Sequence, residues 1–116
     1  MNNVDLVKEV IRVFCENKTD QKALDAHFSP DFEHWANGKK GGLKDYARRL
    51  AAYGAAYENF KIPTWDEVFA AEDKVVTSYV LEGRKKDGAE DRMAVMAVWH
   101  VKDGKIAALH EVDASV

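Results

Sequence analysis

Cysteine and proline are both scarce in this sequence, which has one cysteine, Cys15, and two prolines in 116 residues. A single cysteine excludes an internal disulfide and suits a reducing compartment, so we expect a cytoplasmic protein. Cys15 follows Phe14 within an expected helix and has no basic neighbour that would activate the thiol. A nucleophilic role for this cysteine is therefore not expected.

Long apolar runs and an excess of positive charge are also missing. No segment approaches the ~20 apolar residues of a membrane-spanning helix, and Asp5 and Glu9 do not fit a signal peptide. The formal net charge is -3, and the basic runs at 39–40 and 84–86 are short. We therefore expect neither a membrane nor a nucleic acid as a partner.

The composition that remains is that of a folded globular protein. Hydrophobic residues make up 47% of the chain and charged residues 32%,. The length suits one domain, and no linker, repeat or low-complexity run divides it. Residues 1–116 are expected to form a single domain.

Three helices are predicted in the first half. Apolar residues recur at helical spacing from Val4 to Phe14, with Asn3 as the expected N-cap. Asp20 can cap a short second helix, which a turn at 29–31 would end. A third helix is expected after a flexible glycine-rich turn at 37–42. One face of this helix carries Leu43, Tyr46, Ala47, Leu50, Tyr53, Gly54 and Tyr57,.

The rest of the chain is predicted to form strands, which makes the fold class α+β. A short strand at 32–36 precedes four longer segments rich in Val, Trp, Tyr and Phe, at 60–71, 74–84, 90–102 and 105–113,. The Asp-Gly pairs at 87–88 and 103–104 favour tight hairpins, so consecutive strands should pair antiparallel. Pro63 predicts a bulge or an edge position.

The strand at 90–102 has two apolar faces instead of one. Its two alternating sets are Met93, Val95, Ala97, Trp99, Val101 and Ala94, Met96, Val98, His100,. Helices that cover one face of an antiparallel sheet leave the other apolar face in need of cover, and a second copy of the chain is the simplest source. A homodimer through the sheet is therefore expected.

Four features mark the layout of the chain: the two-helix start, the step from Phe28 to Phe32 into a strand, Gly42 before a helix, and the turn at 103–106 before the last strand. Together they resemble SnoaL-like proteins of the nuclear transport factor 2-like superfamily, over essentially the whole chain. The resemblance implies a cone-like, curved antiparallel sheet wrapped around three N-terminal helices, with one small-molecule pocket. It implies fold more strongly than function.

Two activities found in that superfamily are not expected here. The ketosteroid isomerase pattern needs a tyrosine on the first helix and aspartates on the first and penultimate strands. The resemblance places Arg12, Ala36 and Met96 at these positions, and none is the required type. The Arg and Asp pair of limonene epoxide hydrolases is not evident either.

The resemblance also implies which residues face the pocket. The inward strand positions would be Phe32, His34, Ala36, Ala94, Met96, Val98, His100, Ala107, Leu109, Glu111 and Asp113. Tyr46, Tyr53 and Tyr57, with Trp65 or Tyr79, would form the walls, and His110 would face the opposite side unless a bulge intervenes. Such a pocket suits a small apolar molecule with one polar handle.

His34 and Glu111 are the predicted catalytic pair, because a carboxylate in a dry pocket can exchange protons and an imidazole can shuttle or orient them. The predicted substrate-binding residues are Tyr46, Tyr53, Tyr57, Met96, His100 and Asp113. The simpler alternative places the polar residues at the wet mouth of the barrel and the tyrosines in core packing.

No cofactor and no metal site is predicted. Gly38, Gly41 and Gly42 do not have the spacing of a phosphate-binding loop, and the run 110–113 lacks the spacing of a helical zinc motif. Two function classes stay open: a cofactor-free acid/base isomerase, cyclase or dehydratase, and a non-catalytic ligand-binding or dimeric interaction module. A weaker third class is protein binding like that of the transport factor itself.

Overall fold

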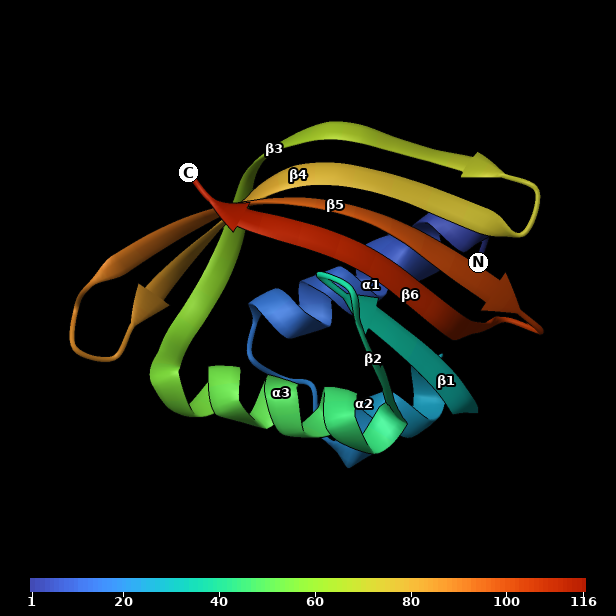
Figure 1. Cartoon of the computed structure of the whole chain (residues 1–116), viewed down its shortest axis with the longest axis horizontal. Coiled ribbons are helices and arrows are strands. Elements are labelled where there is room, and N and C mark those ends of the chain that lie inside the picture. Colours follow the sequence, from blue (N-terminus) through green and yellow to red (C-terminus); the bar gives the residue numbers. More distant parts are fainter.

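The structure, a computed structural model, describes every residue from Met1 to Val116. The long strands of the sheet arch over the helices (Figure 1). The elements follow in the order α1 (Asn3–Cys15), α2 (Gln21–His27), β1 (Phe28–Ala36), β2 (Lys39–Gly42), α3 (Leu43–Ala56), β3 (Tyr57–Ala71), β4 (Lys74–Lys85), β5 (Glu90–Lys102) and β6 (Lys105–Ser115). None of the helices combines the length and apolarity needed to cross a membrane.

All six strands belong to one sheet, in the order β2-β1-β6-β5-β4-β3. The strands β3 to β6 form the predicted antiparallel meander. The expectation of a wholly antiparallel sheet is wrong at one place, because β1 pairs parallel with β6. β1 enters the sheet from α2, so no tight turn forces it to run opposite to β6. The sheet is therefore mixed and open.

Short-range signals fix the starts of the first two helices. The Asn2 side chain accepts a hydrogen bond from the Asp5 amide at 2.8 Å, one residue earlier than the expected cap at Asn3. The predicted cap at Asp20 is confirmed, since its carboxylate accepts from the Ala23 amide at 2.9 Å. Each cap satisfies an amide that the first turn of a helix leaves unpaired.

The glycine-rich segment at 37–42 is a hairpin, whereas a flexible turn was expected. Asn37 and Gly38 have φ values of 49° and 84°, which a type I′ turn requires, and the next residues pair with β1 as β2,. Asp103 and Gly104, at 53° and 74°, form the predicted tight turn of the same kind. Pro63 lies in the edge strand β3, where the register shifts, as predicted.

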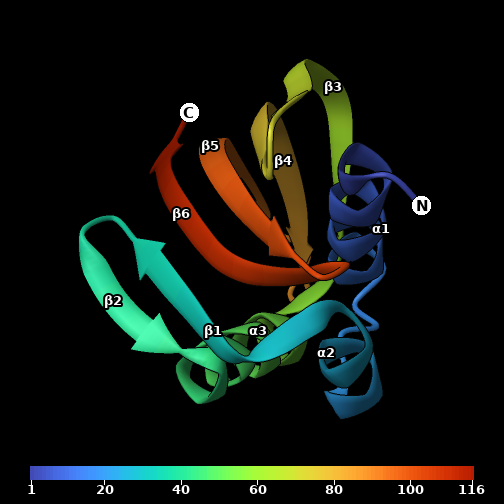
Figure 2. The same cartoon turned by 90° about the vertical axis from the view of Figure 1, so that its right-hand side faces the viewer.

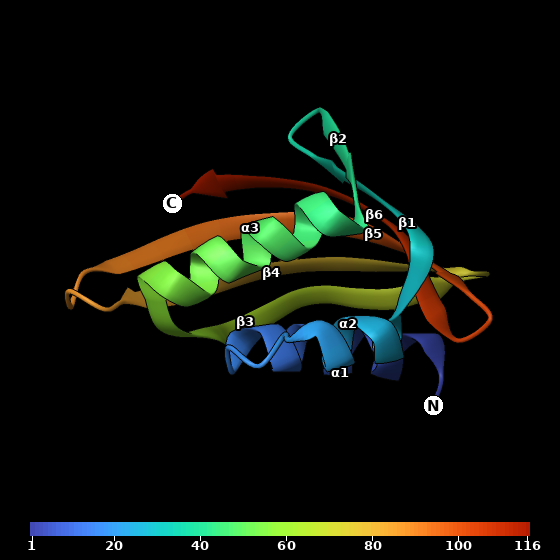
Figure 3. The same ribbon diagram turned by 90° about the horizontal axis from the view of Figure 1, so that it is seen from below.

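The three helices lie on one face of the sheet, which we call the inner face (Figure 3). The sheet curves around them from β3 to β2 (Figure 2). The inner face and the helices share one core, which includes Val7, Phe32, Val75, Ile106 and Leu109. Burial of these side chains supplies the main stabilising term of the fold. We call the opposite side of the sheet the outer face.

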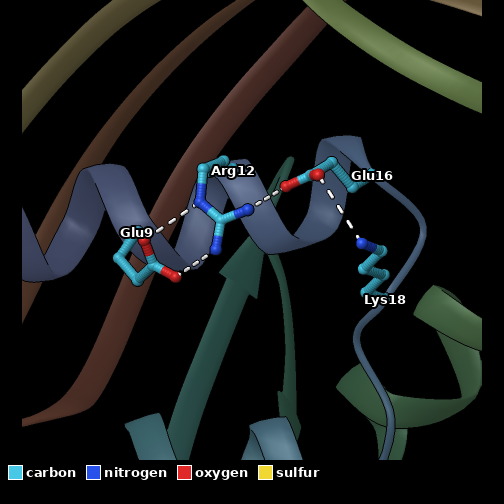
Figure 4. A network of polar contacts seen from close by, with 4 residues as sticks. All are labelled: Glu9, Arg12, Glu16 and Lys18. Carbon is cyan, nitrogen blue, oxygen red and sulfur yellow. Dashed lines mark hydrogen bonds and ion pairs between the residues drawn. The ribbon is translucent and has the colours of Figure 1, made fainter.

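The exposed side of α1 carries ion pairs in place of apolar residues. The Arg12 guanidinium contacts the carboxylates of Glu9 and Glu16, and the Lys18 ammonium lies 3.7 Å from Glu16 (Figure 4). Arg12 therefore lies away from the core, while its neighbours Val10 and Ile11 are buried. This division of one helix into two sides follows the helical period of its apolar residues.

Candidate functional site

A cavity of about 60 Å³ lies between the inner face of the sheet and the helices α1 and α3. Twelve of its 15 lining residues are hydrophobic. The lining residues with a hydroxyl or a charge are few: Tyr46, Tyr53, Tyr79, Arg49, Glu111 and Asp113. A mostly apolar hollow with a few polar groups has the lining of a small-molecule site, although its volume is well below the roughly 300–1,000 Å³ of sites for drug-sized ligands.

Glu111 and His34, the predicted catalytic pair, are in contact. His34 Nε2 and Glu111 Oε1 are 2.8 Å apart, and their side chains are 5% and 18% exposed. The parallel pairing of β1 with β6 brings the two residues together. Glu111 lines the cavity, whereas His34 does not; its ring packs edge-on against Tyr46 at 4.8 Å. His34 can therefore act on a ligand only through Glu111.

Asp113, predicted to bind substrate, lines the cavity one inward position beyond Glu111. Its Oδ1 accepts a hydrogen bond from Asn37 Nδ2 at 3.2 Å, and its amide donates to Asn37 Oδ1 at 3.0 Å. Asn37, in the tight turn after β1, therefore holds Asp113 in place, as His34 on β1 holds Glu111. Each carboxylate has one oxygen engaged and keeps the other for a ligand,.

Three tyrosine hydroxyls at the cavity have no hydrogen-bond partner in the structure, those of Tyr46, Tyr53 and Tyr79. Burial, reinforced by the charge of Glu111, raises the pKa of Tyr46 and of Tyr79 well above the usual value. Burial also raises the pKa of Tyr53, with Asp113 adding to the shift and Arg49 opposing it. All three phenols therefore stay protonated and can donate to a ligand. Tyr46 and Tyr53 lie at the cavity as predicted.

Tyr57 is not at the cavity, contrary to the prediction. It is the first residue of β3 and not a part of the third helix, and its hydroxyl donates to Asp91. That hydrogen bond, with burial, raises the pKa of Tyr57 to about 12. Its ring packs on Phe60 at 4.6 Å. The helix ends one residue earlier than the aromatic spacing predicts, so the side chain turns away.

Met96 and His100 are also misplaced by the sequence prediction, because both lie on the outer face. Met96 is 59% exposed, and the His100 ring contacts that of His110 at 5.1 Å. The residues of β5 that line the cavity are Met93, Val95 and Trp99. Both alternating sets of residues on β5 are apolar. A prediction that misplaces the strand by one residue therefore exchanges its two faces without burying any charged side chain. His110 is exposed on the outer face, as predicted.

The sequence prediction missed Arg49, the only cation at the cavity. Arg49 follows Tyr46 by three residues and precedes Tyr53 by four, which places all three on one side of α3. That spacing is visible in the sequence. The prediction also missed the wall that α1 provides through Val10, Ile11 and Phe14.

Comparison with known proteins identifies the family. The SnoaL-like domain family matches residues 7–109. The chain belongs to this family. A relative in Schizosaccharomyces pombe, an uncharacterised protein, is 21% identical over 106 residues, which cover 91% of this chain and 81% of the relative.

Solved structures of this SnoaL-like chain's neighbours share its fold. A nuclear transport factor 2-like protein from Anabaena variabilis has a TM-score of 0.77 at 21% identity, with 97% of this chain and 90% of that chain covered. A candidate SnoaL-like polyketide cyclase from Jannaschia sp. has a TM-score of 0.73 at 14% identity, covering 97% and 89%. The neighbours support the curved α+β architecture and no specific activity.

Proposed function

We propose that the SnoaL-like cavity binds a small, largely apolar molecule and that Glu111 transfers a proton to or from it. The observation that carries the proposal is the contact of Glu111 with His34 at 2.8 Å, at the wall of an otherwise apolar cavity. A positioned carboxylate with a second proton-carrying group behind it is the arrangement that general acid–base catalysis uses. The family relationship supports a ligand-binding or cyclase-type role of this kind.

His34 is a positioning residue in this proposal. Its Nε2–H donates to Oε1 of the ionised Glu111, which leaves Oε2 as the oxygen that can take a proton from the ligand,. When Glu111 carries the proton, the imidazole can hold the carboxyl group in the same orientation. Isomerisation, cyclisation and dehydration all need such a proton transfer and need no cofactor for it.

The experiment is solvent deuterium exchange on ligands found by thermal denaturation. Steroids, polyketide-like aromatics, terpenoids and aliphatic acids that bind only the folded protein raise its melting temperature. Each such ligand is then incubated in heavy water and followed by NMR. Glu111→Gln should slow exchange about a hundredfold or more while binding persists. Glu67→Gln, at an exposed position on β3, is the matched control.

His34→Gln tests positioning apart from packing. It should lower the exchange rate and change its pH profile while the melting temperature stays near that of the wild type. Ligands that bind all these proteins equally and never exchange would contradict proton transfer. That outcome would favour the second function, a non-catalytic ligand-binding module, which the separation of His34 from the cavity supports.

We also propose that a second copy of the chain covers the outer face. A row of residues in direct register crosses five strands: Phe69, Val76, Val98, His110 and Trp35. Phe69, Met96 and Val112 are 47%, 59% and 55% exposed on this face. A two-fold pairing of such faces would bury them without disturbing the cavity.

Light scattering coupled to gel filtration tests the dimer. The wild type should elute with the mass of two chains, and Met96→Glu with the mass of one, because pairing would bury an unpaired charge. Lys44→Glu, at an exposed position on α3, should keep the wild-type mass. A monomeric wild type at high concentration would disprove this proposal and leave the cavity proposal intact.

A further inference from the structure

Arg49 differs from every other arginine of the chain. The sequence has five arginines, and four of them lie within 4 Å of a carboxylate oxygen: Arg12, Arg48, Arg84 and Arg92. Arg49 has no such partner, although its neighbour Arg48 pairs with Asp45 at 3.0 Å. It lines the cavity and is exposed, which places it at the rim.

Four side chains of the cavity lining can donate a hydrogen bond and lack a partner: Tyr46, Tyr53 and Tyr79, whose hydroxyls can also accept, and Arg49,. Glu111 and Asp113 each have one oxygen engaged, by His34 and by Asn37, and keep the other. Arg49 is the one cation of the lining and only donates, so the group that complements it is an oxygen acceptor with a negative charge,.

We propose that the ligand is a small apolar carboxylate whose carboxylate group is held by Arg49 at the rim, with its apolar body in the cavity. This inference rests on the proposed function, since it assumes that the cavity is the ligand site. Tyr53 follows Arg49 by four residues on the same side of α3 and also lines the cavity, so it is the neighbouring donor to the same group,. A guanidinium fork matches the two oxygens of a carboxylate.

The charges of the site also fix the orientation of the ligand. The carboxylates of Glu111 and Asp113 repel a ligand carboxylate, which is therefore expected beside Arg49 and not beside them,. At the rim, the ligand carboxylate keeps part of its hydration, so the cost of removing water from it stays small. The apolar body then lies in the cavity that Glu111 lines.

Calorimetric titration with matched probes tests this inference. Hexanoate, octanoate and hydrocinnamate are each compared with the methyl ester and the primary amine of the same skeleton. The wild type should bind the carboxylates at least about tenfold more tightly than the esters, and the amines more weakly still. Arg49→Gln should remove this preference, whereas Arg49→Lys should retain part of it.

Arg48→Gln is the matched control, since Arg48 is adjacent, exposed and outside the cavity lining. It should leave the carboxylate preference unchanged. Equal binding of acids and esters by the wild type, tighter binding of the amines, binding of no probe, or an unchanged preference in Arg49→Gln would each overturn the inference. If the wild type prefers carboxylates but no ligand exchanges deuterium, this inference is upheld and the acid–base function is contradicted.

Discussion

The two faces of the sheet differ more in how their side chains are covered than in composition. On the inner face, Val75, Thr77 and Trp99 are at most 3% exposed, and the Trp99 indole N–H donates to Thr77 Oγ1 at 3.0 Å. On the outer face, Phe69 and Met96 remain about half exposed. An apolar strand face therefore becomes core only where a helix covers it.

The histidines show the same difference. His34, on the inner face, is 4% exposed and has a defined carboxylate partner. His100 and His110, on the outer face, contact each other, and His110 stacks on Trp35 at 5.7 Å. One environment gives the imidazole a defined hydrogen-bond partner, and the other leaves the rings to contact aromatic neighbours near the surface.

Phenylalanines on the two faces provide the largest contrast in stability. Phe32→Ala should lower the free energy of unfolding by about 3–5 kcal/mol, because the ring is 2% exposed and its removal leaves a cavity,. Phe69→Ala should cost about 1 kcal/mol or less at a protein concentration where the chain is monomeric. Urea denaturation measures both values. Equal losses would mean that the outer face is as well packed as the inner one.

A smaller effect is expected at the buried hydrogen bond. Thr77→Val keeps the shape of the side chain but leaves the Trp99 N–H without an acceptor, at a cost of about 1–3 kcal/mol,. The neighbouring outer-face change Ser78→Ala should stay within about 0.5 kcal/mol. The same denaturation experiment checks the pair, and a neutral Thr77→Val would show that Trp99 finds another acceptor.

The smallest expected effect is a pH dependence from His100. Burial lowers the pKa of His100 from the ordinary value of 6.5, with His110 and Lys74 adding to the shift and Asp73 opposing it. The unfolded chain therefore binds more protons than the folded one just below pH 6.5, so the free energy of unfolding falls as the pH drops through that window,. Above it, the group contributes no pH dependence.

His100→Gln should weaken this acid-side loss of stability, as measured by urea denaturation between about pH 5 and pH 8 at fixed protein concentration. His27→Gln, at the end of α2, is the matched control on another element. An unchanged pH profile in His100→Gln would show that other groups carry the dependence.

Much of the fold follows from local sequence signals. The helical spacing of apolar residues in α1, the cap at Asp20 and the tight turn at Asp103 and Gly104 are each decided within a few residues. The hairpin at Asn37 and Gly38 has an equally local signal, because Asn-Gly is a preferred pair for a type I′ turn, although the following glycines favour the prediction of a flexible turn,.

The site was harder to predict because strand faces are not a local property. On β6 the carboxylates of Glu111 and Asp113 stand two positions apart and therefore share one face. The prediction that this face lies at the cavity is correct. On β5 both faces are apolar, so the alternation of residues does not decide between Met96 and Trp99 for the cavity. Side-chain size gives a partial signal, since the larger tryptophan gains more from burial.

Local patterns of residues specify the three helices and the antiparallel meander from β3 to β6, because each depends on residues that are close together in the chain. The parallel pairing of β1 with β6, and the choice of the sheet face that the helices cover, depend on contacts between distant parts of the chain. His34 and Glu111 are separated by 77 positions in the chain. Their contact depends on that long-range strand pairing, which no local pattern of residues specifies.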